Sequence, residues 1–225
     1  MDFTIKNLWV FDVFGLEVWI TETVVNTWII MLLLIAAAIA ARLKLRAYKE
    51  IPSGFQNAVE AIVEAFDKFA KDTLGDKNMF LGNWFFMVFA FVLISNLSGI
   101  VGMRPPTADW ATTFALTLVS FALIHVMGVV HRRGRYLKSF FEPNFVFFPL
   151  NLIGELARPV SLSFRLFGNV LAGMIVMSML YSLAPIFLRF VIPVALHAFF
   201  DLLYGALQTY VFCVLSMTFI HMAST

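Results

Sequence analysis

The sequence predicts an all-α integral membrane protein with five transmembrane helices and one interfacial amphipathic helix, forming a single membrane domain over residues 1–225. Of these residues, 61% are hydrophobic and only 13% are charged, and the mean hydropathy is +0.87. So few charges would not cover the surface of a soluble globule, and such high hydrophobicity excludes intrinsic disorder. Several uncharged runs also reach the roughly 20 residues that a helix needs to cross a bilayer.

The first transmembrane helix is predicted over residues 24–41, which contain no charged residue. The small residues 36–41 are also typical of a signal-peptide cleavage site. A signal peptide begins with basic residues, however, and the residues before this run include four acids: Asp2, Asp12, Glu17 and Glu22. We therefore predict a retained anchor. Because the basic residues Arg42, Lys44, Arg46 and Lys49 follow it, the positive-inside rule places this end in the cytoplasm and residues 1–23 outside.

Residues 51–75 predict a helix that lies along the membrane surface. Apolar residues recur at helical spacing on one face, and charged residues share the other face. The apolar face consists of Phe55, Val59, Ile62, Val63, Phe66 and Phe69, and the charged face consists of Glu60, Glu64, Asp67, Lys68 and Lys71. Pro52 and Ser53 provide a start signal, with the serine available as the N-cap. Such a helix is expected at the cytoplasmic interface or against partner helices.

Two further spans, residues 79–103 and 110–130, form a predicted helical hairpin. The first span ends at Arg104-Pro105-Pro106, where successive prolines stop a helix. The second span closes with a basic cluster in residues 131–138. The turn at residues 104–109 is therefore expected outside and the basic cluster in the cytoplasm, in agreement with the first span.

The last two helices are predicted over residues 145–183 and 186–222 and form a second hairpin. Each is longer than a simple crossing requires, so both are expected to tilt strongly or to be buried against protein. Five crossings place the C-terminus in the cytoplasm. The sequence has no inverted repeat of the kind that many secondary transporters contain, which weakens a transporter interpretation.

Five polar residues on the first long helix recur every three or four positions and can line one helix face: Glu155, Arg158, Ser161, Arg165 and Asn169. Arg165 is the most informative of them, because it lies well inside the apolar run. An arginine at bilayer depth costs on the order of 3 kcal/mol or more. Arg165 must therefore face an anion, a wet cavity or a partner protein.

The second long helix carries its own polar face, made of His197, Asp201, Tyr204 and Gln208. If the two helices pack antiparallel, their polar faces meet each other or one shared cavity, which would join Asp201 and His197 to Asn169 and Arg165. Two interpretations are open at this point. The residues form a functional ionisable site, or they form an interhelical polar clamp that stabilises by about 0.6–2 kcal/mol per hydrogen bond.

Motifs for other chemistry are missing from the sequence. It has no Gly-rich nucleotide loop, no nucleophile elbow and no paired cysteines, and its four scattered histidines lack metal-site spacing. We therefore predict no catalytic residue, no cofactor, no bound metal and no nucleic-acid partner. The chemistry that remains is the movement of charge.

Residues 158–169, RPVSLSFRLFGN, followed by Ala172-Gly173, closely resemble the signature helix of subunit a of the rotary F-type ATP synthase. Residues 208–212, QTYVF, resemble the matching segment of that family's last helix. Further similarity at residues 52–54, Gly75, Asn96 and residues 106–109 extends the resemblance over most of the chain. One departure concerns a carboxylate. Many bacterial members carry a glutamate directly after the glycine that matches Gly173 and a histidine on the last helix, where this chain has Met174 and Asp201.

The resemblance implies a stator subunit of the membrane Fo sector in the bacterial cell membrane. Such a subunit is not itself an enzyme, because ATP chemistry belongs to the F1 sector. Its implied partners are the c-ring, against which the last hairpin packs, the subunit b peripheral stalk and, indirectly, F1. In this family two offset aqueous half-channels carry H+ or Na+ to and from the c-ring carboxylates, and the arginine that matches Arg165 separates them. Ion flow is thereby coupled to ring rotation and ATP synthesis.

Carried over to this sequence, the resemblance implies that ion translocation involves Arg165, Asn169, Asp201, Gln208, His197 and Tyr204, with Glu155, Arg158 and Ser161 as a supporting polar face. Asp201 is expected to line the outer half-channel in place of the missing glutamate. Two other classes remain as alternatives. A secondary transporter would transport when purified alone, and a structural scaffold would tolerate Arg165→Ala with only a loss of stability. The coupling ion is chosen largely on subunit c, so this chain does not fix it.

Overall fold

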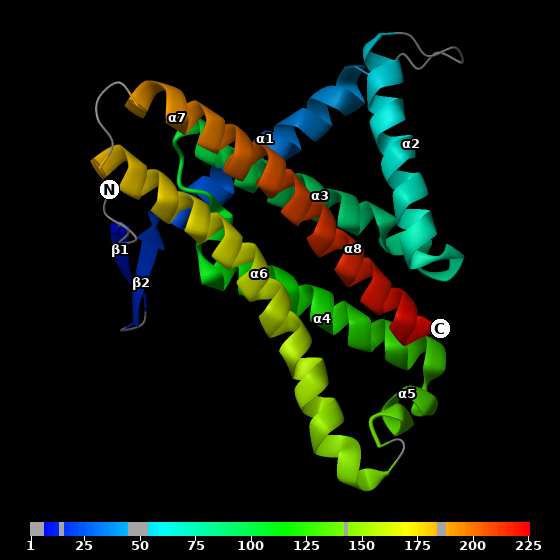
Figure 1. The fold of residues 1–225 in the computed structure, drawn as a ribbon. Helices are drawn as coiled ribbons and strands as arrows, with labels where there is room; N and C mark the ends of the chain where they lie inside the picture. Colours follow the sequence, from blue (N-terminus) through cyan, green and yellow to red (C-terminus); the bar gives the residue numbers. More distant parts are fainter. Residues whose placement is uncertain (1–6, 14–15, 45–53, 142–143, 184–187) are drawn as a thin grey trace.

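The computed structural model describes residues 7–13, 16–44, 54–141, 144–183 and 188–225, and nearly all of these are helical (Figure 1). In chain order the elements are β1 (Asn7–Val13), β2 (Leu16–Thr21), α1 (Glu22–Lys44), α2 (Phe55–Leu74), η2 (Asp76–Leu81), α3 (Gly82–Leu97), η3 (Ser98–Val101), η4 (Pro106–Ala108), α4 (Trp110–Arg132), α5 (Gly134–Ser139), η5 (Phe145–Phe147), α6 (Phe148–Leu183), α7 (Leu188–His197), η6 (Ala198–Tyr204) and α8 (Gly205–Ser224). The β1–β2 sheet and the C-terminal end of α8 lie on opposite sides of the bundle.

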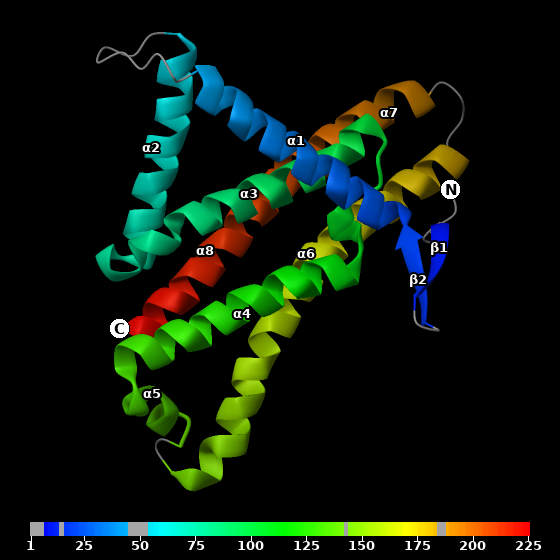
Figure 2. The ribbon, with the colours of Figure 1, turned by 180° about the vertical axis from the view of Figure 1, so that it is seen from behind.

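Within the described ranges, five helical segments are long and apolar enough to cross a membrane: Glu22–Lys44, Asp76–Val101, Trp110–Arg132, Phe145–Ser182 and Ile192–Ser224. They confirm the predicted all-α membrane fold. The last two segments contain 38 and 33 residues, well beyond the length of a simple crossing. They lie side by side near the loop that joins them and then diverge, and α4 packs between α6 and α8 (Figures 1 and 2).

A two-stranded antiparallel sheet precedes α1, and the sequence analysis did not predict it. β1 and β2 pair so that Asp12 lies opposite Glu17 and Val13 lies opposite Leu16. The sheet continues directly into the first span, because β2 ends at Thr21 and α1 begins at Glu22. Both strands are short and apolar residues fill most of their positions, so no regular alternation marks them in the sequence.

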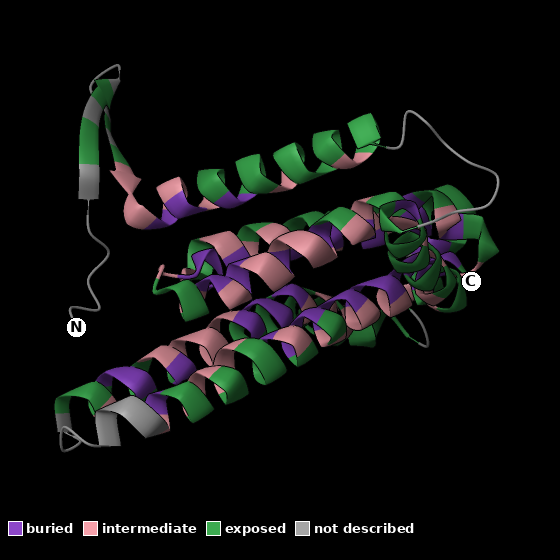
Figure 3. Ribbon diagram, turned by 90° about the horizontal axis from the view of Figure 1, so that it is seen from above, coloured by how far each residue is buried: buried purple, intermediate pink, exposed green. Residues whose placement is uncertain are grey.

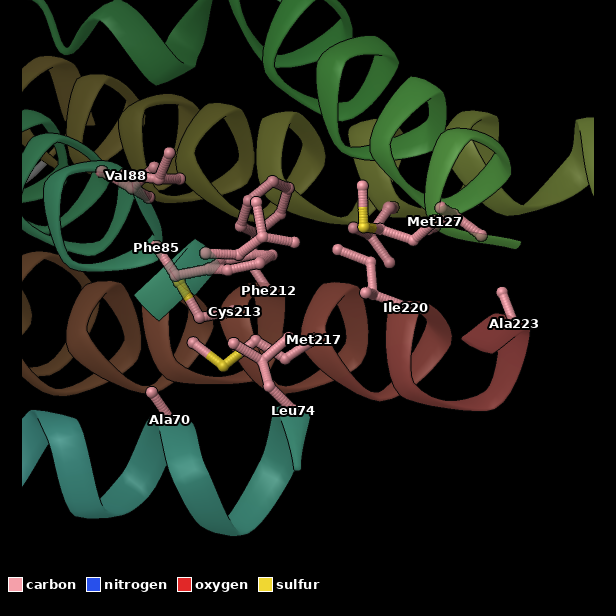
Figure 4. Close-up of a cluster of buried hydrophobic side chains, with 14 of the residues drawn as sticks. Ala70, Leu74, Phe85, Val88, Met127, Phe212, Cys213, Met217, Ile220 and Ala223 are labelled. Atoms are coloured by element: carbon pink, nitrogen blue, oxygen red, sulfur yellow. The ribbon is translucent and has the colours of Figure 1, made fainter. Parts of the chain in front are cut away.

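The core is built around α8, which contacts α2, α3 and α4. Its residues Phe212 and Met217 are 1% and 0% exposed, and they lie among side chains that the neighbouring helices contribute (Figure 4). Leu74 comes from the end of α2, Phe85 from α3 and Met127 from α4. Of the four predicted polar residues of the last helix, only Gln208 lies on this enclosed element, whereas His197 ends α7 and Asp201 and Tyr204 lie in η6, which has no buried residue.

The first span, by contrast, lies on the outside of the bundle. Figure 3 shows α1 along one side of the molecule with most of its surface exposed. Leu32 is 65% exposed and Ile39 is 53% exposed, as expected for a helix that faces lipid. A polar contact holds the first turns of α1, because the Asn26 amide donates to the backbone carbonyl of Arg104 over 3.0 Å.

The amphipathic helix α2 begins at Phe55, and the predicted start signal at Pro52 and Ser53 lies outside the described residues. Its second half packs on the bundle through Phe66 and Leu74. Its first half projects away from the bundle, and Ile62 there is 62% exposed (Figure 1). The exposed apolar face of α2, which follows the end of the first span, is suited to contact with the membrane interface or with a partner helix.

Candidate functional site

The polar faces predicted on the two long helices meet at a direct hydrogen bond. The Asn169 amide on α6 donates from Nδ2 to Oε1 of Gln208 on α8 over 2.8 Å. Gln208 is only 4% exposed. The two helices run in opposite directions in Figure 1, so the antiparallel packing on which the sequence argument depended is present at this level.

A small cavity lies beside this hydrogen bond. Its lining combines polar side chains from α3, α6, η6 and α8 with a few apolar ones: Asn96, Asn169, Val170, Gly173, Phe200, Asp201, Tyr204, Gly205 and Gln208. Asp201 is bonded in turn to His197, with 2.5 Å between Oδ2 and Nδ1. Four of the predicted ion-path residues thus surround one cavity, and His197 joins them through Asp201.

Asp201 lies in a π-helical segment, η6, that sequence reasoning missed. This segment is inserted between α7 and α8, so that one long helix contains a wider turn at the carboxylate. Such turns are rare and are frequently found at functional sites. The spacing of apolar residues does not predict such a turn, because a helical turn can take up one extra residue without requiring any particular residue type.

Asn96 is a second site residue that the residue pattern alone did not single out. It is 2% exposed, and its amide donates to the carbonyl oxygen of Gly205 over 3.0 Å and to the Thr209 hydroxyl over 3.2 Å. The Thr107 hydroxyl donates to its Oδ1 over 2.7 Å. These bonds tie α3 and η4 to the start of α8, directly after η6. A signal was present, since an asparagine within an otherwise apolar span needs hydrogen-bond partners.

Arg165 lies apart from this cavity. It is exposed on α6, does not line the cavity, and forms no ion pair within the described residues. Its neighbour Phe164 is 54% exposed and stacks on Trp110 with 5.7 Å between ring centroids. The inward face of α6 is formed instead by Leu162, Ser163 and Leu166. The structure therefore does not bring Arg165 to Asp201.

The remaining predicted residues of α6 fall into two environments. Arg158 donates from Nη1 to Oε2 of Glu155 over 2.8 Å, and its guanidinium lies 5.0 Å from the ring centroid of Phe219 on α8. It also lines a second small cavity with the buried hydroxyl of Ser216, which has no hydrogen-bond partner within the described residues. Ser161 is exposed. Glu155 and Arg158 therefore neutralise each other, whereas Arg165 keeps an unbalanced charge.

The chemistry available in the first cavity is that of proton or cation transfer. A carboxylate, a phenol and three amides line it, and an imidazole is bonded to the carboxylate; these groups exchange protons or orient hydrogen bonds. Among the described residues, no group of three or more His, Cys, Asp or Glu side chains could hold a metal ion. The fold and this site define a multi-pass membrane protein with ionisable side chains between its helices, a feature that is typical of membrane proteins that move charge.

Comparison with known proteins gives the family. The family model described as the ATP synthase A chain matches residues 24–221. ATP synthase subunit a of Moorella thermoacetica is 38% identical over 204 residues, covering 89% of each chain, and that of Trichlorobacter lovleyi is 37% identical over 208 residues, covering 88% of this chain and 85% of the relative. The sodium-ion-specific subunit a of Propionigenium modestum is 34% identical over 218 residues, covering 89% and 73%. The chain therefore belongs to the ATP synthase subunit a family, the ion-translocating membrane subunits of ATP synthases.

Proposed function

We propose that this chain is the ion-conducting stator subunit of the membrane sector of a bacterial ATP synthase, and that Arg165 faces the carboxylates of a rotating c-ring. One observation carries the proposal. Arg165 is a permanently charged residue on an exposed face of a membrane helix, without an ion-pair partner in the described chain. A charge in that position requires an anion, and a passing c-subunit carboxylate supplies one from another chain.

A fixed guanidinium has two consequences for an ion path. It favours the deprotonated form of a carboxylate opposite to it, so that the ion leaves the ring there. It also repels a cation that would otherwise pass directly between the two half-channels. Ion flow is then possible only with rotation, which uses about 2.3 kcal/mol per charge for each 100 mV of membrane potential.

The outer half-channel is proposed to use the cavity between α6 and η6. Asp201 relays the ion with His197, while Tyr204, Gln208 and Asn169 orient it or its hydrating water. The position of Gly173 supports a role for Asp201 in place of the family's glutamate. Gly173 and Asp201 line the same cavity. The carboxylate of Asp201, although it is carried by the last helix, therefore lies beside position 174, where many family members have their glutamate. The Glu155–Arg158 pair and Ser161 lie outside this cavity and are proposed as a supporting polar face of α6, without a net charge of their own.

The proposed partners are the c-ring along α6 and α7–α8, the subunit b stalk, and the F1 sector, which performs the ATP chemistry without a catalytic residue from this chain. Orientation in the bacterial cell membrane is proposed from the basic residues that follow α1 and α4. By the positive-inside rule, these residues support an orientation with the N-terminus outside and the C-terminus in the cytoplasm. The coupling ion is H+ or Na+.

Site-specific photocrosslinking tests the proposed position of the ring. A photoreactive phenylalanine analogue replaces Phe164, which adjoins Arg165, and the control replaces Trp28, a 50% exposed residue of α1. In membranes that contain the assembled complex, the analogue at residue 164 should yield an adduct with a small hairpin subunit of the ring, and the control should not. Adducts with lipid alone at residue 164 would contradict the proposal.

A further inference from the structure

The segment that follows α4 concentrates positive charge at one membrane–water interface. Residues 131–138, here called the basic turn, contain four exposed cations and no acid: Arg132, Arg133, Arg135 and Lys138. None of the four forms an ion pair within the described residues. The next acid along the chain, Glu142, lies outside those residues. Within the part of the chain that the structure describes, the turn is therefore a cationic surface whose charges have no ion-pair partner.

The basic turn is held in one conformation. Arg133 has a φ of 49°, which is unusual for any residue other than glycine, and it caps α4 by donating from its backbone N–H to the Val129 carbonyl over 2.8 Å. The Tyr136 ring folds back onto Gly128, where a Cβ would lie only 2.5 Å from the ring, and its hydroxyl meets His125 Nδ1 at 2.5 Å. Backbone strain that neighbouring contacts hold in place is frequently found at functional sites.

The Tyr136 hydroxyl keeps its proton in this arrangement. Burial, reinforced by the nearby Glu155, raises the pKa of Tyr136 above its usual range. The protonated phenol and the His125 ring nitrogen remain hydrogen-bonded to each other at physiological pH. The Tyr136 contacts thus hold the backbone of the basic turn against α4, and the exposed arginines project from this backbone.

Exposed aromatic rings adjoin the basic turn. Phe141, Phe145 and Phe148 stack with ring centroids 4.7–6.2 Å apart, and Phe145 is 71% exposed. This phenylalanine stack is tied to the turn, because the Asn151 amide donates to the Phe140 carbonyl over 2.9 Å. Figure 1 shows α5 and the start of α6 together at one corner of the molecule. Exposed cations beside exposed apolar rings match a lipid with an anionic headgroup and acyl chains.

We propose that the basic turn and the phenylalanine stack bind an anionic phospholipid, with the headgroup phosphate on the arginines and an acyl chain against the rings. Guanidinium groups suit phosphate because they can donate two parallel hydrogen bonds. An acidic segment of another protein would satisfy the cations but would leave the exposed rings in a membrane interface unexplained. Binding at this site requires only that the chain spans a bilayer, and it is independent of the ion path.

The test uses the full chain in nanodiscs that contain equal amounts of phosphatidylglycerol and phosphatidylcholine. Native mass spectrometry measures which lipids remain bound after release. The wild-type chain should retain phosphatidylglycerol preferentially, and the triple variant R132Q/R133Q/R135Q should lose that preference by roughly fivefold per removed charge. The control K68Q/K71Q/K77Q removes three exposed cations of α2 and η2, where acids such as Asp76 already balance the charge. It should keep the preference.

Several results would overturn lipid binding here. One is equal retention of the two lipids by the wild-type chain, and another is an equal loss in the triple variant and the control. Displacement of phosphatidylglycerol by millimolar inorganic phosphate would assign the arginines to a free anion. A photocrosslinker at Phe141 that forms a protein adduct in the assembled complex would assign the surface to a subunit. The variant R132K/R133K/R135K, which keeps the charge, should retain the preference and shows that a loss does not come from misfolding.

Discussion

Asp201 supplies the carboxylate of the cavity between α6 and η6, and its immediate neighbours determine what it can do. His197 lies one helical turn before it and is bonded to it at 2.5 Å. Tyr204 and Gln208 line the same cavity on the following turns. An acid and a base in contact, beside a polar cavity at membrane depth, form an arrangement suited to relaying protons and one that a purely structural clamp does not need.

Replacing Asp201 with asparagine is expected to slow ATP-driven ion pumping in vesicles by roughly 100-fold, because the amide keeps the shape but does not take up a proton. The measurement is the initial rate of ion uptake by the reconstituted complex. Asp72→Asn, which removes an exposed carboxylate from α2, serves as the control and should pump normally. Equal rates for the two variants would remove Asp201 from the ion path.

The sequence could predict the residues that act through helical spacing but not those that act through tertiary contacts. Asn169 and Gln208 were expected on facing stripes, and they do bond to each other. The residue pattern did not predict Asn96 as a site residue, because one of its main hydrogen-bond partners is a backbone carbonyl 109 residues away in the sequence, and no local pattern indicates such a contact. The stripe on α6 was only partly informative. Arg158 contacts Glu155 and α8, whereas Arg165 faces outward. Residue spacing alone does not predict this difference, because it depends on the side chains that each arginine meets.

At the scale of elements, the last helix has a buried second half and a first half that carries the cavity, and the sequence did not predict this difference. Its second half, α8, is the centre of the core, where polar residues such as Thr209 and Ser216 are almost completely buried. Its first half contains the π-helical segment η6, which widens the helix at the cavity. The two halves meet at Gly205, whose carbonyl accepts a hydrogen bond from Asn96 on α3. The position of the cavity therefore depends on the close packing of α3 against Gly205.

Gly205→Ala is expected to disturb this packing, since the added Cβ would lie 3.0 Å from Cβ of Asn96. We expect a lower thermal unfolding temperature for the purified chain in detergent, together with slower pumping, because the strain falls on the helix that carries Asp201. Gly154→Ala is the matched control, as no atom lies within 4 Å of the Cβ it would add. Its effect should be neutral or slightly stabilising, by up to about 1 kcal/mol of helix propensity. Equal stabilities for the two variants would contradict the contact.

At the scale of the whole molecule, the low charge content has a spatial meaning. Most charges lie at helix ends, on α2 or on the basic turn, and few are found within the spans. The number of spans followed directly from the uncharged runs, because hydrocarbon thickness fixes helix length. The sheet before α1 and the short helix α5 did not follow, because each is a local fold-back with little periodicity of its own.

The proposed orientation predicts which side of the membrane each end occupies. Thr225→Cys should react with a membrane-impermeant thiol reagent only in inside-out vesicles, and Trp9→Cys only in right-side-out vesicles. The native Cys213 is 0% exposed and should give little background in either. Labelling of the two ends with the opposite pattern would reverse the orientation, and labelling of both ends from one side would contradict an odd number of crossings.

The most direct test of the ion-coupling role is Arg165→Ala in the complete, reconstituted ATP synthase, with ion uptake and ATP hydrolysis measured on the same vesicles. Arg42→Ala at the end of α1 is the control, since it also removes an exposed arginine beside the membrane. We expect Arg165→Ala to abolish ATP-driven pumping, the detached soluble sector to hydrolyse ATP as before, and Arg42→Ala to pump normally. Retained, coupled pumping by the Arg165→Ala complex would contradict the proposed role of this residue and of the helix face that carries it.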